Sequence, residues 1–164
     1  MYNSKMKYSN PVNLKKVFSS HAVITHNKKL LFFLRDDNPN IPDPNTWSLV
    51  GGEIDTGESH QEAMIREMQE EISVVPKNIK YLGMLATADG RLHAIYLSKM
   101  TEDEVEQIQI GNEGQKVQFF ETENIDKLRL ATNLGKYFEV YGNYIKETVE
   151  KGLEINPTNL GLIS

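Results

Sequence analysis

Three glutamates, Glu67, Glu70 and Glu71, lie within a turn and a half of one expected helix. Like charges three and four residues apart repel each other on a helix surface. Glu70 and Glu71 also fall in the last turn, where the helix dipole makes a carboxylate unfavourable by about 0.3–1 kcal/mol. Residues 53–71 contain seven acidic residues and one basic residue, Arg66, so this segment has little positive charge to offset the repulsion.

A divalent cation would make the same carboxylates favourable. Oxygen ligands three and four residues apart on a helix can converge on one ion, and Mg²⁺ or Mn²⁺ prefers carboxylate, carbonyl and water ligands. The pair Gly51-Gly52 precedes the helix, and glycine lets the backbone approach a ligand and point a carbonyl at it. We therefore predict a Mg²⁺ or Mn²⁺ site. The alternative is a solvated acidic helix face, the usual location of charge runs.

The helix that positions these glutamates has clear local signals. Ser59 and Glu62 fit a capping box, which predicts a helix beginning after Ser59. The helix is expected to run to about Ile72, because Pro76 stops it. Its predicted apolar stripe consists of Met64, Ile65, Met68 and Ile72.

The remaining pattern predicts a mixed sheet with a helix on each side. The segments 20–26 and 29–35 read as a hairpin, and the apolar run Leu30 to Leu34 predicts burial on both faces. Further strands are expected at 47–50, 79–89, 91–100 and 116–122, and a second amphipathic helix at 136–151. One domain is predicted over 17–152, with a loose lead-in at 1–16 and a tail at 153–164.

Composition argues against several classes of protein. The net charge of −5 gives no bulk attraction to nucleic acid or to anionic membranes. The absence of cysteine excludes disulfides and thiolate metal sites. No apolar run reaches membrane-spanning length, and the polar N-terminus is unlike a secretory signal. We therefore predict a cytoplasmic protein.

The stretch from Gly52 to Val74 resembles the signature of the Nudix hydrolases. It reads Gly52, five residues, Glu58, seven residues, and then Arg66-Glu67-Met68-Gln69-Glu70-Glu71-Ile72-Ser73-Val74. The resemblance holds at every defined position except Ser73, where the family carries glycine. That glycine ends the helix in a left-handed conformation, which serine tolerates less well. We expect a modest change in geometry and no lost ligand.

The resemblance implies a Nudix-like α/β/α sandwich with a mixed β-sheet between helices. It also implies cleavage of a diphosphate linked to another group X, with Mg²⁺ or Mn²⁺. Arg66 matches a residue that orients the catalytic glutamate, and Glu58 matches one that braces the site. Glu67 is either the general base or only a ligand, since relatives differ. The positions that match metal ligands are Gly51 (through its carbonyl), Glu67, Glu70 and Glu71.

Candidates outside the signature have two interpretations each. Glu113 is either a further acidic ligand or base, as relatives often place in such a loop, or a solvated glutamate. Arg35 either reaches a substrate phosphate or pairs with Asp36 or Asp37. The loop 36–46 has three prolines and three asparagines, which predicts a stiff loop and makes it our candidate for substrate selection.

Aromatic residues and histidines are interpreted as structural. The aromatic residues expected in the core, one of which could stack on a nucleobase, are Trp47, Tyr81, Tyr96, Phe119 and Phe120. The histidines expected at the surface or in the core, and not as ligands, are His21, His26, His60 and His93.

The leading hypothesis is a metal-dependent hydrolase in which activated water cleaves a diphosphate bond of a nucleoside triphosphate or of a nucleoside diphosphate linked to X. The alternative is a non-catalytic nucleotide-sensing module on the same fold, which would not need the full set of charged residues. A structural acidic helix is the third reading. The expected partner is a small nucleotide, with no membrane and no duplex nucleic acid. The oligomeric state is open, with a homodimer as one option.

Overall fold

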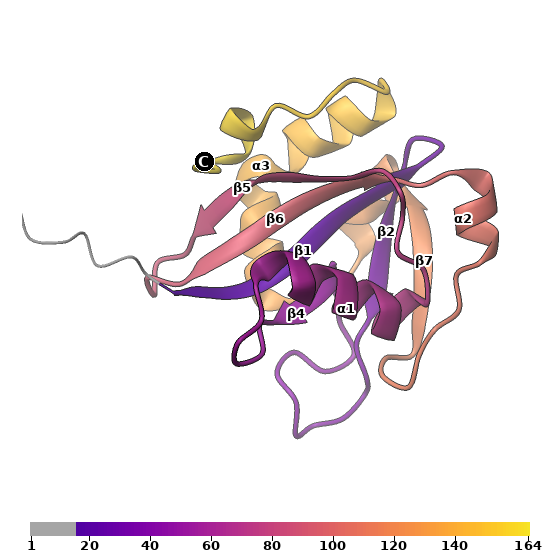
Figure 1. The fold of residues 1–164 in the computed structure, drawn as a ribbon. Coiled ribbons are helices and arrows are strands. Elements are labelled where there is room, and N and C mark those ends of the chain that lie inside the picture. Colours follow the sequence, from indigo (N-terminus) through magenta and orange to yellow (C-terminus); the bar gives the residue numbers. More distant parts are fainter. Residues whose placement is uncertain (1–15) are drawn as a thin grey trace, which may run out of the picture.

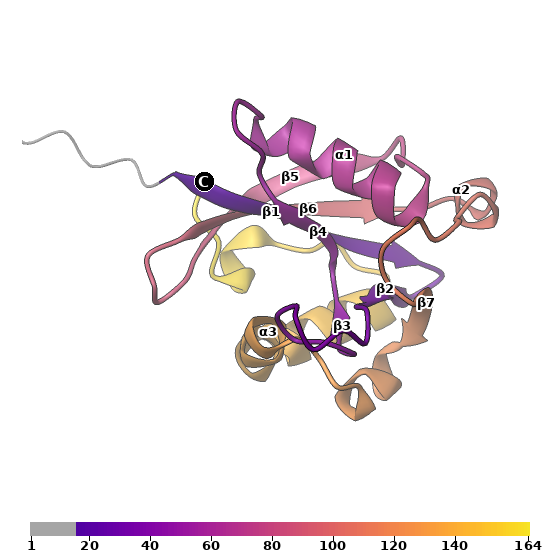
Figure 2. The same cartoon turned by 90° about the horizontal axis from the view of Figure 1, so that it is seen from below.

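The computed structural model describes residues 16–164, and the predicted lead-in lies outside the described residues except for Lys16. A seven-stranded mixed sheet forms the middle layer of this described part. Helix α1 (His60–Ile72) covers one face and α3 (Thr132–Glu150) covers the other (Figures 1 and 2). The predicted α/β/α sandwich is confirmed.

The main path of the sheet runs β3-β2-β1-β6-β5, with β4 paired to β1 and β7 paired to β2. The pair β1–β6 is parallel, and the other strand pairs are antiparallel. The strands are β1 (Val17–His26), β2 (Lys29–Leu34), β3 (Trp47–Ser48), β4 (Val50–Glu53), β5 (Ile79–Ala86), β6 (Leu92–Lys99) and β7 (Lys116–Glu121). The expected strand at 47–50 is therefore two strands, and the glycine pair lies within the second of them.

The core has two parts, one on each face of the sheet. Strand β2 supplies both, because Leu31 and Phe33 pack toward α1 while Leu30 and Phe32 pack toward α3. All four side chains are at most 5% exposed, so the predicted burial of β2 on both faces is confirmed.

Helix α1 begins and ends where the sequence predicts. Ser59 Oγ accepts from the Glu62 N–H at 3.2 Å, and Glu62 Oε2 accepts from the Ser59 N–H at 2.8 Å. The prediction for Ile65 is wrong, because this side chain is 42% exposed. Ala63 is fully buried instead. The apolar residues of α1 that face the core are therefore Ala63, Met64, Met68 and Ile72, and Ile65 is not among them.

Helix α3 begins four residues before the predicted start at 136, at Thr132. The Thr132 N–H donates to Asp43 Oδ2 at 3.2 Å, so a residue 89 positions away caps the helix. Local sequence patterns cannot reveal such a cap. Three short helices were also not predicted: α2 (Glu102–Glu106), η1 (Thr122–Lys127) and η2 (Pro157–Leu160).

The tail 153–164 packs back onto the domain. Leu160 is 1% exposed, and Ile163 exchanges two backbone hydrogen bonds with Met84 of β5, at 2.7 and 2.9 Å. Tyr137 on α3 donates its hydroxyl to the Leu160 carbonyl at 2.8 Å. The tail thus covers part of the outer edge of β5.

The aromatic residues divide between core and surface. Trp47 packs edge-on against Phe120 with ring centroids 4.8 Å apart, and Tyr96 is 4% exposed. The core prediction is wrong for Tyr81, which is 38% exposed. No helix among residues 16–164 has the length and hydropathy needed to cross a membrane.

Candidate active site

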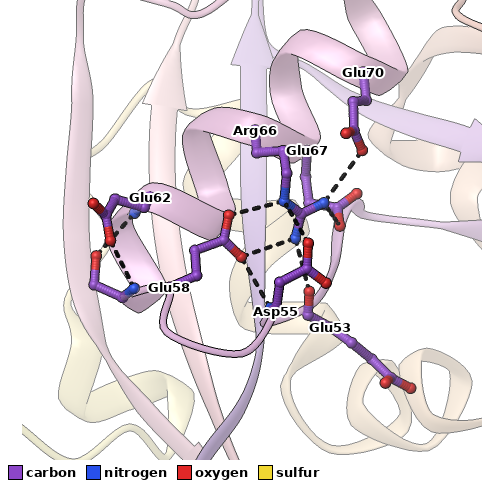
Figure 3. Close-up of polar contacts among 8 residues, drawn as sticks. Glu53, Asp55, Glu58, Glu62, Arg66, Glu67 and Glu70 are labelled. Atoms are coloured by element: carbon purple, nitrogen blue, oxygen red, sulfur yellow. Dashed lines mark hydrogen bonds and ion pairs between the residues drawn. The ribbon is translucent and has the colours of Figure 1, made fainter.

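Arg66, on α1, is the centre of a network of carboxylates (Figure 3). Its Nε and Nη2 donate to the two oxygens of Glu58 at 2.8 and 3.0 Å. Its Nη1 donates to Glu67 at 2.8 Å and to Glu70 at 3.2 Å. Its Nη2 also donates to the Glu53 carbonyl at 2.9 Å. One guanidinium therefore offsets part of the repulsion that the sequence places on this helix.

Arg66 contacts Glu67, the glutamate that the resemblance expects it to orient, and it also contacts Glu58. Glu58 forms a bidentate pair with the guanidinium, the strongest geometry for such a contact. This hydrogen bonding raises the pKa of Arg66 and lowers the pKa of Glu58, so both groups stay charged. Because Glu58 fixes the guanidinium, Arg66 can fix the carboxylate of Glu67 in turn.

Glu71 is a buried carboxylate directly beneath β4. It is 8% exposed, and its Oε2 accepts a hydrogen bond from the Gly51 N–H at 3.0 Å. Burial raises the pKa of Glu71 to about 8, with help from the charges of Glu67 and Glu113 and against the Gly51 hydrogen bond. Burial also raises the pKa of Glu67, although Arg66 opposes that shift. The site therefore holds more negative charge than its surroundings favour.

Both glycines of β4 lie close to neighbouring atoms, and at Gly51 these atoms are backbone. Gly51 has φ +139°, and a Cβ there would lie 2.1 Å from the Ser20 carbonyl oxygen. A Cβ on Gly52 would lie 2.5 Å from Glu67 Oε1. Gly51 therefore packs against β1 and Gly52 packs against Glu67 of α1. The expected approach of this backbone to a ligand stays a prediction.

The loop after α2 closes the C-terminal end of α1. Ser73 adopts the left-handed conformation, with φ 61°, that the family signature assigns to glycine. Its hydroxyl donates to the Gln109 carbonyl at 2.9 Å, and the Gln109 N–H donates to the Ile72 carbonyl at 3.0 Å. A Cβ on Gly111 would lie 1.9 Å from the Glu70 carbonyl oxygen, so this loop touches the helix backbone. Ser73 therefore ends the helix in the same conformation as glycine would, and its hydroxyl adds a hydrogen bond to the loop.

The same loop brings Glu113 to the carboxylates of α1. The charge of Glu113 contributes to the raised pKa of both Glu67 and Glu71. Glu113 itself is exposed. Its role, as a further ligand or as a solvated glutamate, stays a prediction.

Arg35 does not form the ion pair with Asp36 or Asp37 that was one of its two interpretations, and its contact with a substrate phosphate stays a prediction. Its Nε and Nη2 donate to the Pro42 carbonyl at 3.0 and 2.8 Å, and it forms no ion pair with Asp36 or Asp37. The guanidinium therefore ties down the loop 36–46. Its charge nevertheless acts to lower the pKa of Glu71.

The donor set fits a hard divalent cation in its chemistry. Carboxylate and carbonyl oxygens are the ligands that Mg²⁺ and Mn²⁺ prefer, and a cation would favour the ionised forms that burial disfavours. Within residues 16–164, no three acidic or imidazole side chains stand close enough to share one ion. The carboxylate of Glu70 is instead paired with Arg66 at 3.2 Å. The predicted ligands remain Gly51, Glu67, Glu70, Glu71 and Glu113.

A buried polar chain beside the site was missed by sequence reasoning. Ser19 Oγ lies 2.9 Å from His21 Nε2 and 2.6 Å from His93 Nδ1. Burial lowers the pKa of His21 to about 4, helped by the charges of His93 and Arg35, so the ring is neutral at pH 7. Strand alternation does place Ser19 and His21 on one face, but the pairing of β1 with β6 is not visible in the sequence.

The other two histidines make structural contacts. His60 Nδ1 lies 2.7 Å from the Tyr96 hydroxyl, and His26 lies 2.9 Å from the Met100 carbonyl and 2.8 Å from Glu102.

The chain is similar to known proteins in sequence and in fold. It is 29% identical over 109 residues to an ADP-ribose pyrophosphatase of Methanocaldococcus jannaschii, an alignment that covers 65% of this chain and 63% of that protein. The NUDIX domain of Shewanella oneidensis NrtR, solved with ADP ribose, superposes with a TM-score of 0.60, 23% identity, and coverage of 81% and 90%. A Caenorhabditis elegans Ap4A hydrolase superposes with a TM-score of 0.58, 20% identity, and coverage of 79% and 98%.

The family assignment follows from a match over most of the sequence. The model of the NUDIX domain matches residues 16–141, which include β1, the glycine pair, α1 and Glu113. The two superposed structures agree with this match at the level of the fold. The chain belongs to the NUDIX domain family.

Proposed function

We propose that this chain is a Mg²⁺- or Mn²⁺-dependent diphosphohydrolase that cleaves a diphosphate bond in a nucleotide. The carrying observation is the Arg66 network, in which one guanidinium contacts Glu58 and Glu67 at 2.8 Å beside the buried Glu71. This network fixes a carboxylate at the edge of a concentrated negative charge. A purely structural acidic helix does not need an arginine that holds one carboxylate in a fixed position.

In this proposal, Arg66 positions Glu67, and Glu58 positions Arg66. Glu67 accepts the proton of the attacking water, because burial raises its pKa and a base works best when its pKa approaches the working pH. A bound metal would supply charge neutralisation at the non-bridging oxygens of the diphosphate. It would be held by Gly51, Glu67, Glu70, Glu71 and Glu113.

We infer that the substrate is a nucleoside diphosphate linked to X, and ADP-ribose is the first compound to test. The support is the Methanocaldococcus jannaschii relative named ADP-ribose pyrophosphatase, although the alignment spans only 63% of that protein. The loop 36–46 and Arg35 are the proposed contacts for the substrate, because the charge of Arg35 reaches Glu71. A cytoplasmic location belongs to the same proposal.

The decisive experiment is a hydrolysis assay with ADP-ribose, nucleotide sugars, nucleoside triphosphates and dinucleotide polyphosphates. Each compound is incubated with Mg²⁺, with Mn²⁺ and with chelator. Glu70→Gln tests the proposed ligand, and Glu139→Gln, at an exposed site on α3, is the matched control. We expect Glu70→Gln to lower kcat by at least about a hundredfold, the scale for losing one electrostatic stabiliser of a transition state.

The outcomes separate the alternatives. Metal-dependent release of two phosphate-bearing products, lost in Glu70→Gln and kept in Glu139→Gln, supports the hydrolase. Nucleotide-dependent thermal stabilisation without turnover on any compound would favour the sensing module, since a ligand stabilises the folded state by mass action. If Glu67 is only a ligand, Glu67→Gln will weaken metal binding as much as it weakens turnover.

A further inference from the structure

A concave surface lies on the other face of the sheet from α1. Its lining residues come from the C-terminal end of α3 and the segment after it, the β1–β2 turn, and the neighbouring ends of β5 and β6. Its volume is about 390 Å³, which lies within the usual range for small-molecule sites. None of the carboxylates and glycines of the candidate active site lines it.

The floor of this cavity is apolar. Val149 and Ile155 are 6% and 7% exposed, and both belong to the core beneath α3, as does the half-buried Leu97. Leu153 adds an apolar side chain at the rim and is 61% exposed. A ligand body placed here would remove apolar surface from water, which favours binding.

The rim of the cavity is basic, although the whole chain is acidic. Lys28, Lys80 and Lys99 line it together with a single acidic residue, Glu154. The chain as a whole carries a net charge of −5, so this local excess of positive charge runs against its average. Among residues 16–164, the lysines that form ion pairs are at other positions: Lys29, Lys146 and Lys151.

The fold brings the three lysines together from distant parts of the sequence. Lys80 pairs in register with Leu97, and Lys99 lies two residues further along β6, so both lysines share the face of Leu97. Lys28 sits in the β1–β2 turn with φ 61°, and its Cε lies 3.9 Å from where a Gly152 Cβ would be. Backbone geometry therefore fixes where each ammonium can reach.

We propose that this cavity binds a small organic phosphate, with its phosphate among Lys28, Lys80 and Lys99 and its apolar body on the floor of Leu97, Val149 and Ile155. Lysine is a compact cation with three donors, and it forms strong charge-assisted hydrogen bonds to phosphate. The amides of Asn27 and Asn78 supply further polar groups at the rim. This site is separate from the proposed active site and does not depend on hydrolysis.

The test is calorimetric titration of the full chain in chelator, so that no metal can recruit phosphate to the acidic site. The probe is adenosine 5′-monophosphate, compared with adenosine and with inorganic phosphate. The test variant is Lys80→Gln/Lys99→Gln, and the matched control is Lys127→Gln/Lys136→Gln, which removes the same charge from exposed positions outside the cavity. Circular dichroism checks that both variants fold, and Lys99→Gln alone is the substitute if the test variant does not.

We expect saturable binding of the monophosphate that weakens at least about tenfold in the test variant, because hydrogen bonds to charged groups contribute more than neutral ones. Binding should be unchanged in the control variant. Absence of saturable binding at millimolar probe, or equal binding by the test variant, overturns the site. If adenosine binds as tightly as the monophosphate, the lysines do not contribute to binding. If inorganic phosphate binds as tightly as the monophosphate, the apolar floor does not contribute. Either result also overturns the proposal.

Discussion

The acidic site on α1 and the lysine-rimmed cavity beneath α3 use charge in opposite ways. At the acidic site, Arg66 engages Glu58, Glu67 and Glu70 within 3.2 Å, so charged groups are fixed by one another. At the cavity, ion pairing among residues 16–164 leaves out the three rim lysines. Charged side chains that pair with one another hold catalytic groups in place, whereas lysines without an ion pair can bind a ligand. Removing a charge should therefore lower activity or stability more at the acidic site than it lowers stability at the cavity.

The largest expected effect is on the packing that supports the acidic site. Gly51→Ala should lower the free energy of unfolding by about 3 kcal/mol or more, because it adds a Cβ 2.1 Å from the Ser20 carbonyl oxygen at a strained φ. Gly57→Ala is the control, since Gly57 also has positive φ but open space around it, and it should lose only about 1 kcal/mol. Urea denaturation measures both. Equal losses would show that backbone conformation, and not close packing, makes Gly51 necessary.

The next effect is on the fixed charges themselves. Arg66→Lys should reduce kcat/KM by about a hundredfold, because lysine cannot contact both Glu58 and Glu67 in the same planar geometry and a misplaced catalytic group costs about this much. Steady-state kinetics with the substrate found in the panel provides the measurement. Arg91→Lys, at an exposed arginine paired with Asp89, should leave the rate unchanged. Wild-type kcat/KM in Arg66→Lys would mean that the network does not position Glu67.

A smaller effect follows from the buried charge of Glu71. Its folded-state pKa of about 8 exceeds the ordinary value of 4.5, so the folded state binds this proton more strongly than the unfolded state. Its contribution to stability is therefore fully present below pH 4.5 and is lost as the pH rises through about 8. In chelator, the free energy of unfolding should fall by up to about 1.4 kcal/mol per pH unit for this proton.

Glu71→Gln isolates that contribution. The variant keeps a hydrogen-bond acceptor for the Gly51 N–H and cannot ionise, so its stability should fall less steeply than that of the wild type over the same pH window. Denaturation curves at a series of pH values give both slopes. Identical slopes would show that Glu71 does not titrate in this range.

The smallest effect is expected at the cavity. Lys80→Gln/Lys99→Gln should change the free energy of unfolding by no more than about 0.5 kcal/mol, because exposed charges without ion pairs contribute little to stability. Urea denaturation without ligand tests this. A loss of several times that size would mean that these lysines support the fold, and the contrast between the two regions would disappear.

Sequence patterns predicted the parts of this protein that depend on near neighbours. The capping box of Ser59 and Glu62, the end of α1 at Ile72 and the double burial of β2 were all correct. Each rests on residues within a few positions of one another or on the alternation of one strand. The contact of Arg66 with Glu67, which the resemblance implied, joins neighbouring residues of the signature. The contact of Arg66 with Glu58, eight residues away, was not predicted.

The sequence by itself therefore determined the order of the longer strands and of the two long helices, and the charged residues gathered on α1. Only the tertiary structure decided that Glu71 lies under Gly51, that Asp43 caps α3, and that Ser19 connects two histidines. It also decided that three lysines from two strands and a turn surround one cavity. These contacts depend on strand order and register, which are set by the burial of the whole sheet between two helices. A local pattern records the preference of each segment, but not the segment against which it packs.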